Sequence, residues 1–235
     1  MTSSTSKSTY RDGILAGAPF VLVVGPFAIL FGVLAAGAGF SLAQTMAMTI
    51  VVIAGASQFT AVQLITENAP VWIVLAAALA VNLRMAMYSA SLQPYFREAT
   101  LRQRLMIAFG NFDQSYALSI LKFENDPGMS TGDRVSFFLG AVTIIASSWV
   151  AATYVGAAFG AVLLPQDLPL EFAMPIMFLA IVAPMLKTPA HLAAALTSIV
   201  VSLALVWMPS GVGLIFAGLA AMAVGAECER RGFGP

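Results

Sequence analysis

The chain has 235 residues, of which 60% are hydrophobic and only 9% are charged, and its formal net charge is zero. A soluble domain carries about 25% charged residues, so this composition excludes a water-soluble protein and predicts an all-α integral membrane protein. The zero net charge argues against a nucleic-acid partner. One cysteine and one histidine exclude an internal disulfide and multi-cysteine or multi-histidine metal sites, so we expect no metal and no cofactor.

Seven apolar segments follow a polar N-terminal tail at 1–12. A bilayer crossing takes about 20 apolar residues, and no Asp, Glu, Lys or Arg occurs from Gly13 through Thr66. A polar C-terminal tail at 227–235 ends the chain, and 13–226 forms one transmembrane domain. The predicted spans are 13–37, 42–66, 71–93, 135–164, 171–186, 190–208 and 212–226.

A further segment, at 105–121, is short and carries Asn111, Asp113 and Gln114 at its centre. Two interpretations stay open: a re-entrant or buried polar helix, and a full span that lines a cavity. Lys and Arg favour the cytoplasmic side. If the segment does not cross, the N-terminus lies outside and one cytoplasmic face collects eight basic residues. If it crosses, the N-terminus can lie inside. The eight residues are Arg97, Arg102, Arg104, Lys122, Arg134, Lys187, Arg230 and Arg231.

Two stretches, 13–93 and 135–208, share a pattern of a long glycine-bearing span, an interrupted span and an ordinary span. Pro175 and Pro184 interrupt the span of the second stretch. Inverted repeats with an interrupted helix in each half are typical of secondary transporters. We therefore predict an inverted repeat with interrupted helices. The plainer interpretation is that glycine and proline are common in membrane helices.

Small and polar residues interrupt the span at 42–66: Gly55, Ala56, Ser57 and Gln58. An unpaired backbone group in lipid costs several kcal/mol, so a broken helix is tolerated only where it is buried in protein or lines water. If Gly55 loosens the helix, Ser57 can cap a half-helix from Gln58 to Ile65, whose N–H groups form a site for a carboxylate. The alternative is a close-packed crossing in which Ser57 bonds within its own helix.

Arg84 lies near the centre of the span at 71–93, two residues after Asn82. A central arginine costs at least about 2.5–3.5 kcal/mol, so it has to face a partner or a wet cavity. Asp113 is the only acid inside an apolar segment rather than at its edge. A nearby positive charge would hold it ionised. We therefore predict an Arg84–Asp113 pair, either structural or acting as a proton-linked gate.

Two features of the span at 135–164 predict contacts. Gly156 and Gly160 form a small-xxx-small seam that favours a tight helix crossing. Ser147, Ser148 and Trp149 are polar in mid-span and are expected to line the same cavity as the interrupted span at 42–66.

Three motifs, AGASQF (54–59), NLRMAMYSASL (82–92) and FDQSYAL (112–118), occur in this order. Together they resemble the AzlC family, the large subunit of bacterial branched-chain amino acid exporters. The resemblance extends over nearly the whole chain. It departs from the family pattern at Met85, where many members have histidine, and at 112–114, where many have Thr-Asp-Glu. The resemblance implies a small AzlD-type membrane subunit as the partner.

The polar clusters and the resemblance predict a multi-pass protein of the bacterial inner membrane, not an enzyme, that exports branched-chain or other small apolar amino acids with proton coupling at Asp113. The substrate's side chain would rest among Phe27, Phe59 and Met85. The alternative is a channel-type pore-forming subunit without coupled transport. An intramembrane hydrolase using Ser57 and His191 is a weaker alternative, because GASQF lacks the G-x-S-x-G pattern. The expected substrate-binding residues are Gly55, Ala56, Ser57, Gln58, Asn82 and Arg84.

Overall fold

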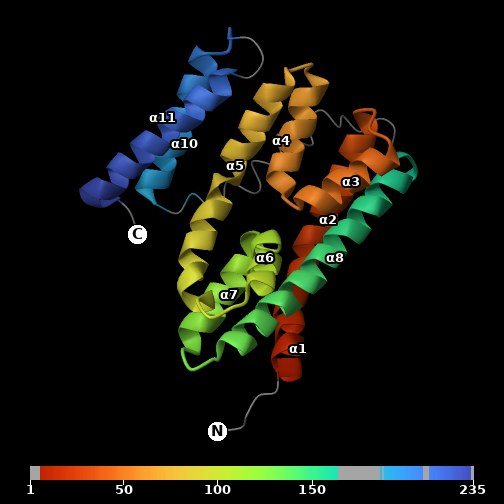
Figure 1. Ribbon diagram of the computed structural model, residues 1–235. Helices are drawn as coiled ribbons and strands as arrows, with labels where there is room; N and C mark the ends of the chain where they lie inside the picture. The colour runs from red at the N-terminus through yellow and green to blue at the C-terminus, as the bar shows by residue number, and fades with distance from the viewer. Residues whose placement is uncertain (1–5, 164–185, 187, 209–211, 234–235) are drawn as a thin grey trace. The chain divides into compact units, whose positions relative to one another are not determined.

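The computed structural model describes residues 6–163, 186, 188–208 and 212–233, and its elements there are helical (Figure 1). The predicted all-α fold is confirmed for these residues. The span predicted at 171–186, with Pro175 and Pro184, lies outside them. The elements are α1 Ser6–Gly17, η1 Ala18–Phe20, α2 Val21–Gly37, α3 Leu42–Val52, α4 Gly55–Thr66, α5 Val71–Leu92, η2 Gln93–Phe96, α6 Leu101–Phe109, α7 Asp113–Asn125, α8 Thr131–Leu163, α10 Pro189–Ala204, α11 Val212–Cys228 and η5 Glu229–Phe233.

The helices group into two compact units. The first unit contains Met1–Gln58 and Val81–Pro165, and the second contains Phe59–Ala80 and Gln166–Pro235. In the second unit, α10 and α11 pack side by side (Figure 1). The predicted Arg84–Asp113 pair and the interruption at 55–58 both belong to the first unit.

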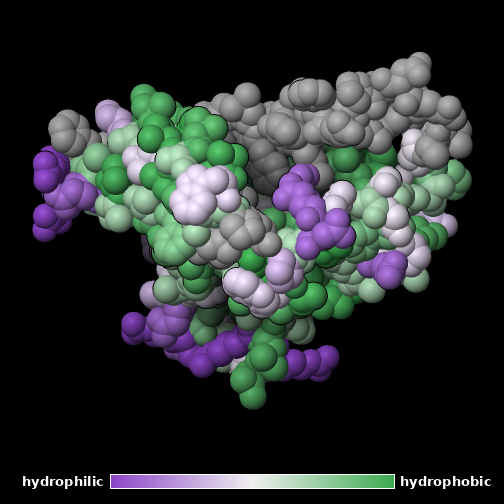
Figure 2. All heavy atoms as spheres, turned by 90° about the horizontal axis from the view of Figure 1, so that it is seen from above, coloured by the Kyte–Doolittle hydropathy of each residue, from purple (hydrophilic) through white to green (hydrophobic). Residues whose placement is uncertain are grey.

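Three helical stretches are long and apolar enough to cross a membrane: Ser8–Gly37, Val71–Phe96 and Thr131–Gly160. They correspond to three of the predicted spans. The predicted span at 42–66 is present as α3 and α4, which are 11 and 12 residues long. Green, hydrophobic atoms cover much of the coloured surface in Figure 2. Large apolar side chains are exposed on these helices, among them Leu22 at 81% and Leu79 at 68%. Such a surface is typical of a protein solvated by lipid.

Reciprocal side-chain caps explain where two of the shorter helices begin. Ser41 precedes α3, and its backbone N–H donates to Oε1 of Gln44 at 2.8 Å while its Oγ accepts the Gln44 N–H at 3.3 Å. Thr100 and Gln103 form the same capping box at the start of α6. Each box satisfies backbone donors that have no partner inside the helix.

Close approach through glycine joins the α1–α2 stretch to α8. A Cβ on Gly156 would collide with the backbone carbonyl of Ile29, and a Cβ on Gly32 would collide with that of Thr153. A Cβ on Gly160 would lie 2.6 Å from Cγ2 of Val33. Only glycine lets the two backbones come this close, so the tight crossing predicted from Gly156 and Gly160 is confirmed.

The α1–α2 stretch and α8 run parallel. Near the start of both, the Thr9 hydroxyl donates to the Asp133 carboxylate at 3.3 Å. Further along both, Gly13 approaches Phe137, and Ile29 meets Gly156 beyond that. The first helices of an inverted repeat would run in opposite directions, so these contacts do not support the inverted relation between 13–93 and 135–208.

The segment 105–121 is not one helix. It is divided at residues 110–112 between α6, of 9 residues, and α7, of 13 residues. A helix advances about 1.5 Å per residue, so neither piece reaches across a hydrocarbon core of about 30 Å. The interpretation of 105–121 as a single full span is therefore wrong. The Gly-Asn step at 110–111 is the local reason, because both residues favour leaving a helix.

Aromatic side chains hold the end of α5, the helices α6 and α7 and the start of α8 together at one end of the first unit. Phe96, Phe123 and Phe138 are buried there, and Phe96 meets the other two edge-on at 5.6 and 5.9 Å between ring centroids. The guanidinium of Arg134 lies 5.4 Å from the ring centroid of Tyr95. This end is called the basic end below. Its cationic residues are Arg97, Arg102, Arg104, Lys122 and Arg134.

The N-terminal end of α1 lies at the basic end, since Thr9 bonds Asp133 there. This arrangement corrects the expectation that a non-crossing 105–121 places the N-terminus opposite the basic face. The expectation counted 42–66 as one complete crossing. The structure divides 42–66 into two helices, each too short to cross alone.

Candidate functional site

The predicted interruption of 42–66 is confirmed, but it lies at residues 53–54. Helix α3 ends at Val52, Ile53 adopts the left-handed conformation with φ 40°, and α4 begins at Gly55. A β-branched residue rarely takes positive φ, so tertiary contacts have to hold Ile53 there. Ser57 does not cap a helix from Gln58 to Ile65, because its hydroxyl donates to the Ala54 carbonyl at 2.9 Å.

Gln58 spans the break with both ends of its amide. Its Oε1 accepts the backbone N–H of Ala54 at 3.1 Å, and its Nε2 donates to Oγ1 of Thr49 at 3.3 Å. The side chain is completely buried. Gln58 therefore ties α3 to α4 and satisfies a backbone donor that the break would otherwise leave unpaired.

Aromatic side chains close over the break. A Cβ on Gly55 would lie 2.6 Å from Cε1 of Phe27 and 2.9 Å from Cη2 of Trp149, so any larger residue would have to displace one of these rings. Trp149 also packs against Phe31, with 6.1 Å between ring centroids. Trp149 therefore lies against the break, while the cavity expected there stays a prediction. Ser147 and Ser148 instead donate to the Ile144 carbonyl of their own helix.

The predicted pair between Arg84 and Asp113 is confirmed. Nη2 of Arg84 lies 3.1 Å from Oδ2 of Asp113, and their side chains are 26% and 40% exposed. The hydroxyl of Tyr88 donates to the other carboxylate oxygen at 2.8 Å. Sequence reasoning missed Tyr88, although its position four residues after Arg84 places it on the same helix face.

The irregular residues before α7 are held by side chains in the same way as the first break. Ser115 Oγ accepts the N–H of Phe112 at 3.0 Å and donates to the Gly110 carbonyl at 2.6 Å. Asn111 Nδ2 donates to Ser89 Oγ at 2.9 Å and to the Met85 carbonyl at 3.3 Å. These contacts fix the start of α7 against α5.

Two polar atoms on α5, at and near Arg84, have no hydrogen-bond partner among the described residues. Asp113 is the first residue of α7, where the helix dipole adds to the attraction of Arg84 for a carboxylate. Asn82 Oδ1 and Arg84 Nε are buried and have no hydrogen-bond partner among the described residues. In the part of the chain that the structure covers, His, Cys, Asp and Glu side chains form no group of three suited to a metal ion.

The structure brings together some of the predicted site residues and not others. Arg84 and Asp113 form a pair, and residues 55–58 form the first turn of α4. Among the described residues, no hydrogen bond joins Arg84 to that turn, and the side chains of Ser57 and Gln58 are bonded within the protein. These two side chains therefore hold the break in place rather than offering donors to a carboxylate.

An apolar helical surface, two interrupted helices and an ion pair inside the helical bundle define a helical membrane protein with a polar site. Comparison with known sequences gives the family. The sequence model of the AzlC protein family matches residues 19–163, so the chain belongs to the AzlC family.

Two relatives extend this result. The chain is 32% identical over 224 residues to an uncharacterized membrane protein of Archaeoglobus fulgidus, covering 94% of this chain and 95% of the relative. It is 28% identical over 181 residues to the inner membrane protein YgaZ of Escherichia coli K12, covering 74% of this chain and 72% of the relative. No solved structure matches the chain.

Proposed function

We propose that this chain is the large subunit of a secondary transporter that exports branched-chain or other small apolar amino acids across the inner membrane. Membership of the AzlC family supports the substrate class, and the name of the Escherichia coli relative supports the location. The observation that carries the proposal is the partly exposed ion pair of Arg84 and Asp113, in which Arg84 lies within the apolar span formed by α5. Charges placed inside the membrane by default mark substrate or proton pathways.

The proposed mechanism is a competition between a proton and the amino acid for the ion pair. With Asp113 ionised, the amino acid enters the pair: its carboxylate meets the guanidinium of Arg84, and its ammonium meets the carboxylate of Asp113 and Oδ1 of Asn82, which has no partner among the described residues. A proton that binds Asp113 from the outside removes the charge of this carboxylate and releases the amino acid there, and the proton then leaves to the inside. Because the site holds either a proton or an amino acid, inward movement of protons drives export.

The first turn of α4, which begins at Gly55, supplies a surface for the apolar side chain of the substrate. The rings of Phe27 and Trp149 lie beside Gly55 and would contact that side chain. The amide of Gln58 contributes by holding the end of α3 and the start of α4 in this arrangement. We further propose a small AzlD-type subunit as the partner, as the family resemblance implies.

The test measures leucine uptake by inside-out vesicles with an acidic interior. The vesicles come from cells that express the chain with any small membrane protein encoded beside it. The variants Arg84→Gln and Asp113→Asn and the double variant are compared at equal amounts of inserted protein. Removing one partner leaves the other charge unpaired inside the membrane, whereas removing both partners leaves no charge there. We therefore expect the double variant to insert well and still lose transport.

Three outcomes contradict parts of the proposal. Near-normal leucine flux in the double variant would show that the pair is structural. Flux that neither saturates nor depends on the proton gradient would favour a channel-type subunit. An absence of leucine flux above vesicles without the protein would overturn the substrate class.

A further inference from the structure

A small cavity lies at the basic end of the first unit, where α5, η2 and α6 meet. Its volume is about 190 Å³. Pockets for drug-sized ligands take about 300–1,000 Å³, so an occupant of this cavity has to be smaller than that class. Buried apolar side chains form part of its wall: Leu92, Phe96 and Ile107 are 2%, 5% and 7% exposed.

Two arginines, Arg97 and Arg104, are among the residues that line the cavity, and no Asp or Glu is among them. Arg104 donates through one nitrogen to the backbone carbonyl of Arg97. Its other donors, and the whole guanidinium of Arg97, have no polar partner among the described residues. Arginine forks match a carboxylate with two parallel hydrogen bonds. The cavity therefore favours a small anionic group at its mouth.

Asn111 adds an acceptor to the same wall. Its side chain is 4% exposed, and its Nδ2 is already used by Ser89 and Met85. Its Oδ1 is buried and accepts no hydrogen bond from the described residues. A buried acceptor without a donor is unfavourable, so an ammonium group that reaches this oxygen would gain a charge-assisted hydrogen bond.

We infer that this cavity binds an α-amino acid with a compact apolar side chain, and that it is the loading site on the basic side of the protein. The inference rests on the proposed function and names a second subsite for the same substrate. The carboxylate pairs with Arg97 and Arg104, the ammonium meets Asn111, and the side chain lies against the apolar wall. An anion without an ammonium leaves Oδ1 of Asn111 unpaired, and an amine without a carboxylate meets two positive charges.

The position of Asn111 connects this loading site to the Arg84–Asp113 pair. Asn111 lies two residues before Asp113, and it bonds the carbonyl of Met85, the residue after Arg84. The same irregular segment therefore forms a wall of the cavity and places the carboxylate of the ion pair. Along α5, Ser89 of the cavity wall lies five residues after Arg84, a rise of about 7.5 Å.

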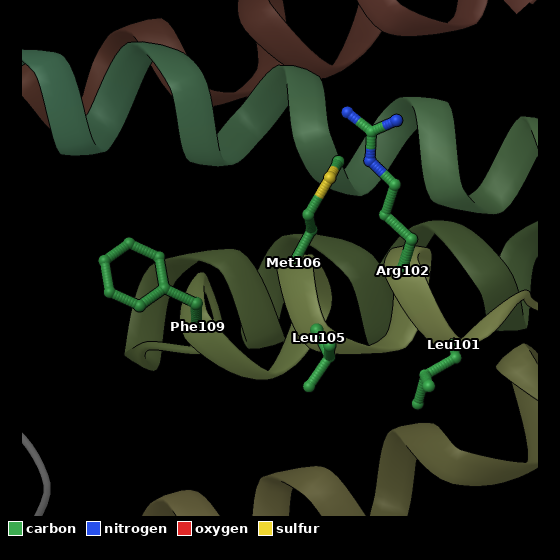
Figure 3. A pocket seen from close by; sticks show the side chains of 5 residues that line it. All are labelled: Leu101, Arg102, Leu105, Met106 and Phe109. Carbon is green, nitrogen blue, oxygen red and sulfur yellow. The ribbon is translucent and has the colours of Figure 1, made fainter.

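Arg102 provides a matched control on the same helix. Together with Leu101, Leu105, Met106 and Phe109 it lines a different, apolar hollow on α6, and Figure 3 shows these five side chains. Replacing Arg102 by alanine removes the same charge and the same length of side chain as replacing Arg104, two residues away, but leaves the cavity intact.

The experiment measures the KM for leucine from uptake into inside-out vesicles for Arg104→Ala, Ala108→Leu and the control Arg102→Ala. Ala108 lines the cavity and is exposed, so leucine there fills space without disturbing a buried core. We expect the KM to rise about tenfold or more for the first two variants and less than twofold for the control. A KM within twofold of the control for both cavity variants would overturn the inference while leaving the proposed function intact.

Competition tests the two charges of the substrate separately. 4-Methylpentanoate lacks the ammonium and 3-methylbutylamine lacks the carboxylate. Both should inhibit leucine uptake at least about tenfold more weakly than valine does, since each loses one charge-assisted contact. Inhibition by 4-methylpentanoate as strong as by valine would overturn the assignment of Asn111. Wild-type vesicles that take up no leucine would overturn both the loading site and the proposed function.

Discussion

Replacing Gln58 by leucine should destabilise the whole protein, because one amide bridges α3 and α4. Gln58→Leu keeps the size of the side chain and removes two hydrogen bonds, at 3.1 Å to the Ala54 N–H and at 3.3 Å to the Thr49 hydroxyl. The Ala54 N–H then stays in a buried place without an acceptor.

The expected size of the effect follows from these contacts. A buried donor left without a partner costs about 1–3 kcal/mol, and a net hydrogen bond contributes about 0.5–1.5 kcal/mol. The sum for Gln58→Leu is about 2–4 kcal/mol. For a chain of this length, a change of 1 kcal/mol moves the melting temperature by about 2–4 °C, so we expect a fall of about 4–16 °C. Thr49→Val removes only the weaker bond and should have a smaller effect.

The assay is a thermal unfolding curve of the detergent-purified protein, followed by the loss of its monodisperse peak in size-exclusion chromatography. Gln63→Leu is the matched control, since Gln63 is exposed on the same helix and its amide bonds only Glu67. Equal melting temperatures for Gln58→Leu and Gln63→Leu would refute the view that Gln58 holds the break together.

Three further predictions concern packing, the ion pair and topology. Gly156→Ala should lower the melting temperature, because its Cβ collides with the backbone of α2. Gly25→Ala, whose Cβ meets nothing within 4 Å, should be neutral or stabilising. A lower melting temperature for Gly25→Ala than for Gly156→Ala would contradict the crossing. Tyr88→Phe removes one hydrogen bond to the carboxylate and should reduce leucine transport about tenfold at unchanged expression, and a fall of less than twofold would exclude a positioning role. For topology, the single cysteine is first replaced by serine, and Ser8→Cys and Ala38→Cys then mark the two ends of the span Ser8–Gly37. Ser8→Cys should react with an impermeant maleimide from the cytoplasmic side, and Ala38→Cys should react from the opposite side. Labelling of both from one side would refute the placement of the N-terminus on the cytoplasmic side.

The charged site could be predicted from the sequence because charge inside a membrane is expensive. Arg84 is far from both ends of its span, and Asp113 is the one acid inside an apolar segment, so each required a partner of opposite charge. No comparable physical cost assigns a role to Tyr88 or Asn111. Their roles depend on which helix faces which, and that is decided by packing between α5 and α7.

The exact place of the first break could not be predicted from residue types. Gly55 was the natural candidate, yet the backbone leaves the helix at Ile53, a residue that disfavours positive φ. Glycine is required at 55 for a different reason, because Phe27 and Trp149 occupy the space of a side chain. The glycine seam of α8 was likewise visible in the sequence, but whether its partner helix ran parallel or antiparallel was not.

The two interruptions share a construction that links stability to transport. In each, a backbone N–H just before a new helix is accepted by a side chain from that helix: Gln58 for Ala54 and Ser115 for Phe112. A single side chain therefore decides whether each break keeps its shape. Because the second break also positions Asp113, a change at the ion pair can reach Asn111 two residues away. Proton binding at the carboxylate would then alter the loading site through the backbone itself, without a separate moving element.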